Sequence, residues 1–91
     1  MPSGKDLFDD LVASMVSRYG DQGYFVAVRL AKMVKYAAEI GCMTWMVAEV
    51  GTKEEAGFDD WIEHCCCGIE TKTITHYPTG RVFKLGVNFG H

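Results

Sequence analysis

The sequence lacks the features by which several large classes of protein are recognised. It contains no run of about 18 apolar residues, which a membrane-spanning helix requires. The segment Met1–Asp6 has no apolar stretch of the kind found in secretory signals. No G-x-G-x-x-G or P-loop motif occurs, so neither kind of phosphate-binding loop is present. We therefore expect a cytoplasmic protein without a membrane span.

An excess of basic residues is also missing. The chain has 9 Lys and Arg against 12 Asp and Glu, which gives a net charge of −3 at pH 7. Because general nucleic-acid binders usually carry a basic excess, we expect no direct contact with nucleic acid. The length of 91 residues and the hydrophobic content of 48% are typical of one globular unit. We predict a single compact domain over residues 1–91.

Paired cysteine motifs are absent, although the chain has four cysteines. Cys65, Cys66 and Cys67 are consecutive, whereas structural zinc sites use spacings such as C-x2-C. We expect free thiols, no cofactor and no resident metal. The alternative is a metal or redox site built on His64 and Cys67, which share a helix face, with a further ligand such as His76 or His91. A cysteine nucleophile is disfavoured, because these thiols follow carboxylates at the predicted end of a helix.

Two helices are predicted in the first half of the chain. Apolar residues recur at helical spacing over residues 4–19, behind a capping Ser3, and Gly20 follows where a left-handed C-terminal residue is expected. Asp21 is positioned to cap a second helix over residues 22–40. This second helix is apolar on nearly all sides, which is typical of a buried helix, so we predict that it is the central element of the core.

The pattern in the middle of the chain does not distinguish a strand from a helix. Residues 42–50 fit a strand or a short helix, because a short apolar run has no decisive period. We favour a strand, since a hairpin alone makes a poor sheet. A capping-box pattern from Thr52 to Glu55 then predicts a helix that continues to Cys67 and stops at Gly68. The apolar stripe of this helix is assigned to the core and holds Phe58, Trp61, Ile62, Cys65 and Cys66.

After Gly68 the apolar period changes from about 3.6 to about 2 residues, which predicts a C-terminal antiparallel hairpin with a turn at 78–80. One possible register pairs Tyr77 with Gly80, and the other pairs Tyr77 with Arg81 around a left-handed Gly80. We predict the second register, because it separates the core face from the solvent face better. It gathers on one face Phe83, Leu85, Val87 and Phe89. The predicted fold class is α+β.

Carboxylates gather on two of the predicted helices, and these are the candidate binding residues. Asp9 and Asp10 lie on the first helix. The larger group belongs to the helix that follows Thr52, and it comprises Glu54, Glu55, Asp59, Asp60, Glu63 and the neighbouring His64. Acidic helix faces can steer a small protein onto a basic partner. We therefore predict a non-enzymatic protein that acts by protein–protein contact, as an inhibitor or adaptor of a basic partner such as a nucleic-acid-handling protein.

Two other functions stay open at this point. One is a metal- or redox-linked protein that uses His64 and Cys67. The other is a small enzyme that uses Asp60 and His64 for general acid–base chemistry, although no second catalytic motif accompanies them and we assign no catalytic residue. Separately, the free edge of the predicted hairpin allows the chain to form a homo-oligomer by strand pairing.

Overall fold

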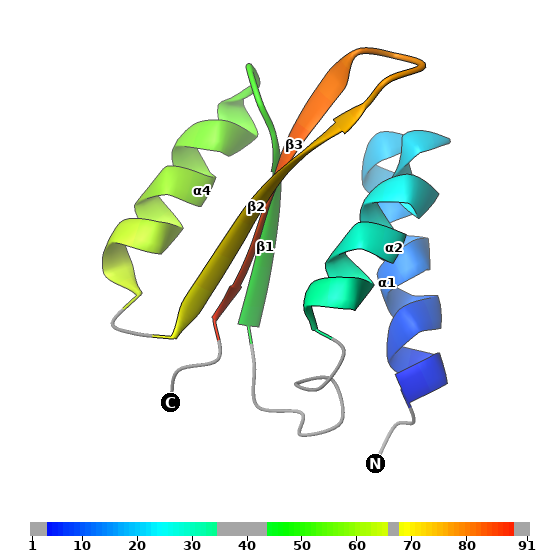
Figure 1. Ribbon diagram of the computed structural model, residues 1–91, viewed down its shortest axis with the longest axis horizontal. Helices are drawn as coiled ribbons and strands as arrows, with labels where there is room; N and C mark the ends of the chain where they lie inside the picture. Colours follow the sequence, from blue (N-terminus) through cyan, green and yellow to red (C-terminus); the bar gives the residue numbers. More distant parts are fainter. Residues whose placement is uncertain (1–3, 35–43, 66–67, 89–91) are drawn as a thin grey trace. The chain divides into compact units, whose positions relative to one another are not determined.

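The computed structural model describes residues 4–34, 44–65 and 68–88, which form two compact units, 1–41 and 42–91 (Figure 1). The prediction of a single domain over 1–91 therefore stays a prediction. The fold class is α+β, as predicted: two helices come first, and a strand, a further helix and a hairpin follow.

The first unit is an antiparallel pair of helices, α1 (Gly4–Tyr19) and α2 (Gln22–Met33). The bounds of α1 confirm the predicted helix over 4–19. Gly20 has a φ of 66° and its N–H donates to Val16 O at 2.9 Å, so the predicted left-handed residue that ends α1 is confirmed. Asp21 is the N-cap residue of α2, but its side chain makes no capping hydrogen bond.

The second helix contributes buried residues to the first unit, and its predicted place at the centre of a single core stays a prediction. The residues of α2 that are fully shielded from solvent are Val26, Ala27 and Leu30. Gly23, near the start of α2, lies directly against α1, because a β-carbon at this position would overlap the backbone carbonyl group of Met15. The helix ends at Met33 with Val34 as its C-cap residue, and positions 35–40 of the predicted span lie outside the described residues, as does the predicted cap Ser3.

The second unit is a three-stranded antiparallel sheet with one helix packed on it (Figure 1). Its elements in chain order are β1 (Thr44–Glu49), α4 (Lys53–His64), β2 (Ile69–His76) and β3 (Arg81–Asn88). The strand order is β1-β3-β2, so β1 pairs with the last strand and the predicted strand within 42–50 is confirmed. The central strand β3 carries three fully shielded side chains, which are Phe83, Leu85 and Val87.

The predicted hairpin register is wrong. His76 pairs with Arg81 and Ile74 pairs with Phe83, which is the register with Tyr77 opposite Gly80. The four-residue loop is closed by its own polar groups: the N–H groups of Thr79 and Gly80 donate to His76 O, at 3.1 and 2.8 Å, and the Thr79 hydroxyl bonds to Nδ1 of His76 at 2.8 Å. Gly80 is left-handed as predicted, with a φ of 72°.

The register error has a physical cause. We assumed that one face of the hairpin is buried and the other exposed, as in a sheet covered on one side. In the structure α4 packs on β1 and β3, on the face that carries Gly86, while Phe83, on the opposite face of β3, is also buried. The edge strand β2 is exposed along Glu70 to Thr73. The pattern of its side chains therefore does not indicate which face of the hairpin is buried.

Helix α4 begins where predicted but ends early. Its last residue is His64, and Cys65 has an extended backbone, with φ −80° and ψ 130°. The prediction of a helix through Cys67 that stops at Gly68 is therefore wrong, and helical spacing does not assign a face to the cysteines. Cys65 is half-buried, and Cys66 and Cys67 lie outside the described residues. The core of the α4 contact is Phe58, which is 2% exposed and packs beside Trp61 with ring centroids 6.0 Å apart.

Candidate partner-binding surface

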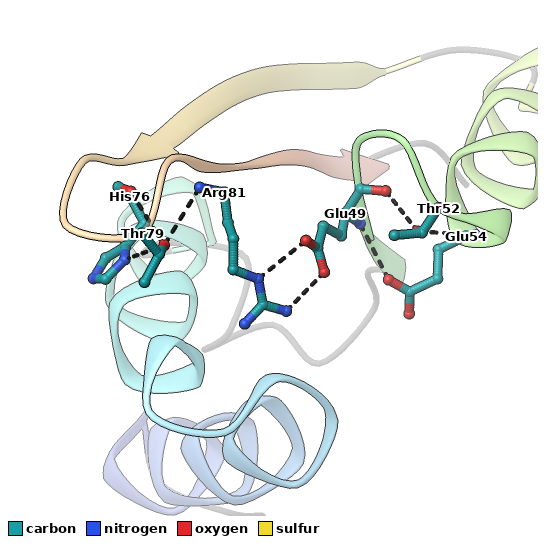
Figure 2. A network of polar contacts seen from close by, with 6 residues as sticks. All are labelled: Glu49, Thr52, Glu54, His76, Thr79 and Arg81. Carbon is teal, nitrogen blue, oxygen red and sulfur yellow. Dashed lines mark hydrogen bonds and ion pairs between the residues drawn. The ribbon is translucent and has the colours of Figure 1, made fainter.

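The start of α4 is fixed by a network of polar contacts around Thr52 (Figure 2). The Thr52 hydroxyl donates to Glu49 O at 2.7 Å and accepts from Glu54 N at 3.3 Å, so the predicted cap is confirmed. A carboxylate oxygen of Glu55 accepts the N–H of Gly51 at 3.1 Å, which is the reciprocal bond of a capping box shifted by one residue. These bonds hold the helix N-terminus to the end of β1.

Three of the predicted binding residues, Glu54, Glu55 and Asp59, are engaged within the fold. The Glu54 carboxylate accepts the N–H of Glu49 at 3.1 Å, so the backbone N–H of the last residue of β1 has a hydrogen-bond partner. Glu55 lies 2.7 Å from Nζ of Lys84 on β3, and Asp59 lies 3.2 Å from the same nitrogen. The hydrogen bond from Lys84 lowers the pKa of Glu55, and the hydrogen bonds to Glu55 and Asp59 raise the pKa of Lys84. Glu54 and Glu55 therefore position α4 on the sheet.

Asp59, although it bonds to Lys84, and the remaining predicted residues of α4 face solvent. The side chains of Asp59, Asp60 and His64 are 61, 71 and 76% exposed, and Glu63 is also exposed. His64 Nδ1 donates to the backbone carbonyl oxygen of Asp60 at 2.8 Å and lies 3.5 Å from its carboxylate. We call Asp59, Asp60 and Glu63 the acidic surface of α4. Asp9 and Asp10 are exposed on α1, which belongs to the other unit.

The proposed metal ligands are not assembled in the described part of the chain. Among residues 4–34, 44–65 and 68–88, no group of three or more His, Cys, Asp and Glu side chains is placed to hold a metal ion. His64 uses Nδ1 for the carbonyl of Asp60, and Cys67 lies outside the described residues. The pairing of His64 with Cys67 was inferred from helical spacing, and α4 ends before Cys67.

A cleft of about 150 Å³ opens between α4 and the edge strand β2. Its walls are Phe58, Asp59 and Ile62 of α4, and Thr71, Lys72, Thr73 and Lys84 of the sheet. Asp60 and His64, the residues of the enzyme hypothesis, are not among its lining residues. The cleft was not predicted from the sequence, because its position depends on the register of β2 and on the side of the sheet that α4 covers.

A second feature that the sequence does not reveal is the ion pair of Arg81 and Glu49 (Figure 2). Arg81 donates from Nε and Nη2 to the two carboxylate oxygens of Glu49, at 3.0 and 2.7 Å, and its guanidinium lies 5.4 Å from the centre of the Phe83 ring. Hydrogen bonding by Arg81 lowers the pKa of Glu49, against a smaller opposing effect of burial. The pair joins β1 to β3, and no signal in the sequence pairs residues 32 positions apart.

We expect Glu49→Gln to destabilise the fold in a pH-dependent way. The folded-state pKa of Glu49 lies below its unfolded value, so the carboxylate contributes stability above the unfolded pKa and loses it as pH falls through the folded pKa. The variant should lose about 1–2 kcal/mol of unfolding free energy at neutral pH and much less near pH 3. Urea unfolding at both pH values measures the difference, with Asp10→Asn as an exposed control. A loss that is equal at both pH values would contradict the assignment.

Comparison of the chain with protein-family models, with curated proteins and with solved structures finds no match. Among the described residues, no helix combines the length and the apolar composition that crossing a bilayer requires. The evidence for function is therefore the surface chemistry of the described residues, and above all the contrast between the engaged and the exposed carboxylates of α4.

Proposed function

We propose that the protein is a cytoplasmic, non-enzymatic inhibitor or adaptor, and that the acidic surface of α4 binds a basic partner protein. The observation that carries this proposal is the exposure of Asp60 and Glu63, next to Asp59, which is exposed although it bonds to Lys84, while Glu54 and Glu55 on the same helix are more fully engaged by backbone amides and Lys84. Exposed carboxylates on successive turns present a concentrated negative potential, which accelerates and orients the approach of a basic surface.

The position of these carboxylates on α4 supports a role other than stability. Glu63 lies in the last turn of the helix and Asp60 lies one turn earlier. The C-terminal end of a helix carries a partial negative charge, which disfavours carboxylates there. A negative side chain at such a position lowers stability, and a role in binding would account for it.

Replacing Glu63 should therefore raise stability while it weakens binding. We expect Glu63→Gln to increase the unfolding free energy by roughly 0.3 to 1 kcal/mol at low ionic strength, because it removes an unfavourable charge–dipole interaction. Thermal unfolding followed by circular dichroism measures the change. Asp10→Asn, on the other unit and within α1, is the control and should show a smaller change. A lower unfolding temperature for Glu63→Gln would contradict the electrostatic argument.

The binding proposal is tested by comparing variants in partner capture. The full chain and the double variant Asp60→Lys/Glu63→Lys are each used to capture proteins from an extract at low and at moderate salt. We expect the wild-type chain to retain a basic protein that the double variant loses and that salt releases. The matched control is Asp9→Lys/Asp10→Lys, which makes the same charge change on the other unit. Equal loss of the partner from both double variants would show that net charge, and not α4, determines binding.

A further inference from the structure

The strand β2 forms an open edge of the described sheet, because the strand order is β1-β3-β2. One hydrogen bond fixes which of its backbone groups face outward. Val50 N donates to Val82 O at 2.8 Å, so the even-numbered residues of β3 turn their N–H and C=O groups toward β1 and the odd-numbered residues turn theirs toward β2. The odd-numbered residues of β3 pair with even-numbered residues of β2. The backbone groups at the open edge are thus those of Ile69, Thr71, Thr73 and Thr75.

The side chains along this edge carry alternating opposite charges. Glu70, Thr71, Lys72 and Thr73 are all exposed. Thr71 and Thr73 are paired with Gly86 and Lys84, so they lie on the face that α4 occupies, and Glu70 and Lys72 lie on the other face. Charged residues on an edge strand commonly prevent strand pairing. A glutamate and a lysine two positions apart are different, because an antiparallel copy can place each opposite the other.

We propose that β2 is a self-association edge, where a second copy of this chain adds its own β2 antiparallel, with Thr71 opposite Thr71 of the second copy. The outward backbone groups of Thr71 then form a hydrogen-bonded pair across the dyad. In this register Glu70 lies opposite Lys72 of the second copy. The twofold symmetry also places Lys72 opposite Glu70 of the second copy. Centring the dyad on Glu70 or on Lys72 instead places like charges opposite each other, which is destabilising. Centring it on Thr73 leaves Lys72 opposite an isoleucine.

The cleft beside β2 supports the same register. With Thr71 on the dyad, Ile69 of the second copy stands opposite Thr73, on the face that α4 occupies. Thr73 lines the cleft together with Phe58 and Ile62. The half-buried Ile69 of each copy therefore adjoins the apolar wall of the other copy's cleft, which adds apolar burial to the backbone and charge pairs. Two sheets joined in this way form one continuous sheet with both α4 helices on the same face.

A charge-exchange experiment tests the proposal on the full chain by sedimentation velocity. The wild-type chain should show a concentration-dependent monomer–dimer equilibrium. Glu70→Lys and Lys72→Glu should each weaken dimerisation about tenfold or more, because each converts two attractive pairs into two repulsive ones. Equimolar mixing of the two variants should restore association as a heterodimer, and the double variant E70K/K72E should restore the homodimer. Lys32→Glu, an exposed charge reversal on α2, should leave dimerisation unchanged.

Three outcomes would overturn the proposal. The first is a wild-type chain that stays monomeric up to roughly 1 mM. The second is a dimer that neither single reversal weakens, and the third is a mixture of the two reversals that associates no better than either alone. Since Glu70 and Lys72 are exposed, unchanged circular dichroism spectra will show that these variants fold. None of these outcomes bears on the binding of a basic partner by Asp60 and Glu63, which is measured separately.

Discussion

Gly23→Ala is expected to lower the unfolding free energy by about 2–3 kcal/mol, a large part of the stability of a domain of this size. The β-carbon added at this position would overlap the main-chain carbonyl of Met15 on α1. A backbone group cannot rotate aside as a side chain can, so α1 and α2 must move apart and lose packing around Leu30 and other buried residues. The alanine's better helix propensity offsets only a small part of this cost.

The control for this prediction is a second helical glycine in open space. Gly57 lies within α4, is exposed, and has no neighbouring atom within 4 Å of an added β-carbon. Gly57→Ala should therefore stabilise the protein by roughly 0.5–1 kcal/mol, the ordinary difference in helix propensity. Chemical denaturation of the two variants measures both effects. If Gly23→Ala is neutral, or stabilises as Gly57→Ala does, the described contact of α2 with α1 is incorrect.

The second large effect is expected at Gly86, where α4 meets the sheet. An added β-carbon would lie 2.7 Å from Cζ3 of Trp61 and 3.1 Å from Cζ of Phe58. Both aromatic rings are packed between the helix and β3, so Gly86→Ala should displace α4 and cost about 1–3 kcal/mol. The change should also weaken partner capture, because it moves the helix that carries Asp60 and Glu63.

A compensating substitution distinguishes this steric effect from a loss of strand stability. Trp61→Leu removes the nearer ring, so Gly86→Ala should cost less in the Trp61→Leu background than in the wild-type chain. Urea denaturation of the four proteins gives the coupling free energy between the two positions. Additive effects of the two substitutions would show that the ring of Trp61 does not contact the backbone at Gly86 as described.

Local signals in the sequence predicted the elements that depend on local interactions. The helix over 4–19 and its left-handed Gly20, the cap at Thr52 and the left-handed Gly80 were predicted correctly, because each depends on residues within a few positions. The predicted strand within 42–50 is also confirmed. It was inferred because a two-stranded hairpin alone makes a poor sheet, and not from the pattern of its own residues.

Features that depend on long-range contacts were missed or wrong. The hairpin register was wrong because it was inferred from one buried face, whereas both Phe83 and Gly86, on opposite faces of β3, are buried. The ion pair of Glu49 and Arg81 requires the order β1-β3-β2, which no local pattern encodes.

The candidate site was predicted only as a list of carboxylates. Sequence spacing placed Asp9 and Asp10 on α1 and the larger group on α4, but it did not separate Glu55, which bonds to Lys84, from the exposed Asp60. The separation depends on which strand faces the helix and on the position of Lys84 within it, and both follow from strand pairing. The end of α4 was also misplaced, since Cys65 is already extended three residues before Gly68.

The central claim, that the acidic surface of α4 binds basic partners, is tested most directly by nuclear magnetic resonance. The isotope-labelled full chain is titrated with a short oligolysine peptide at low salt, and the same titration is repeated with Asp60→Lys/Glu63→Lys. The predicted result is a set of amide shift changes concentrated on residues 59–64, which shrink as salt is added and disappear in the double variant. Shift changes that centre on Asp9 and Asp10, or that persist in the double variant, would contradict the claim.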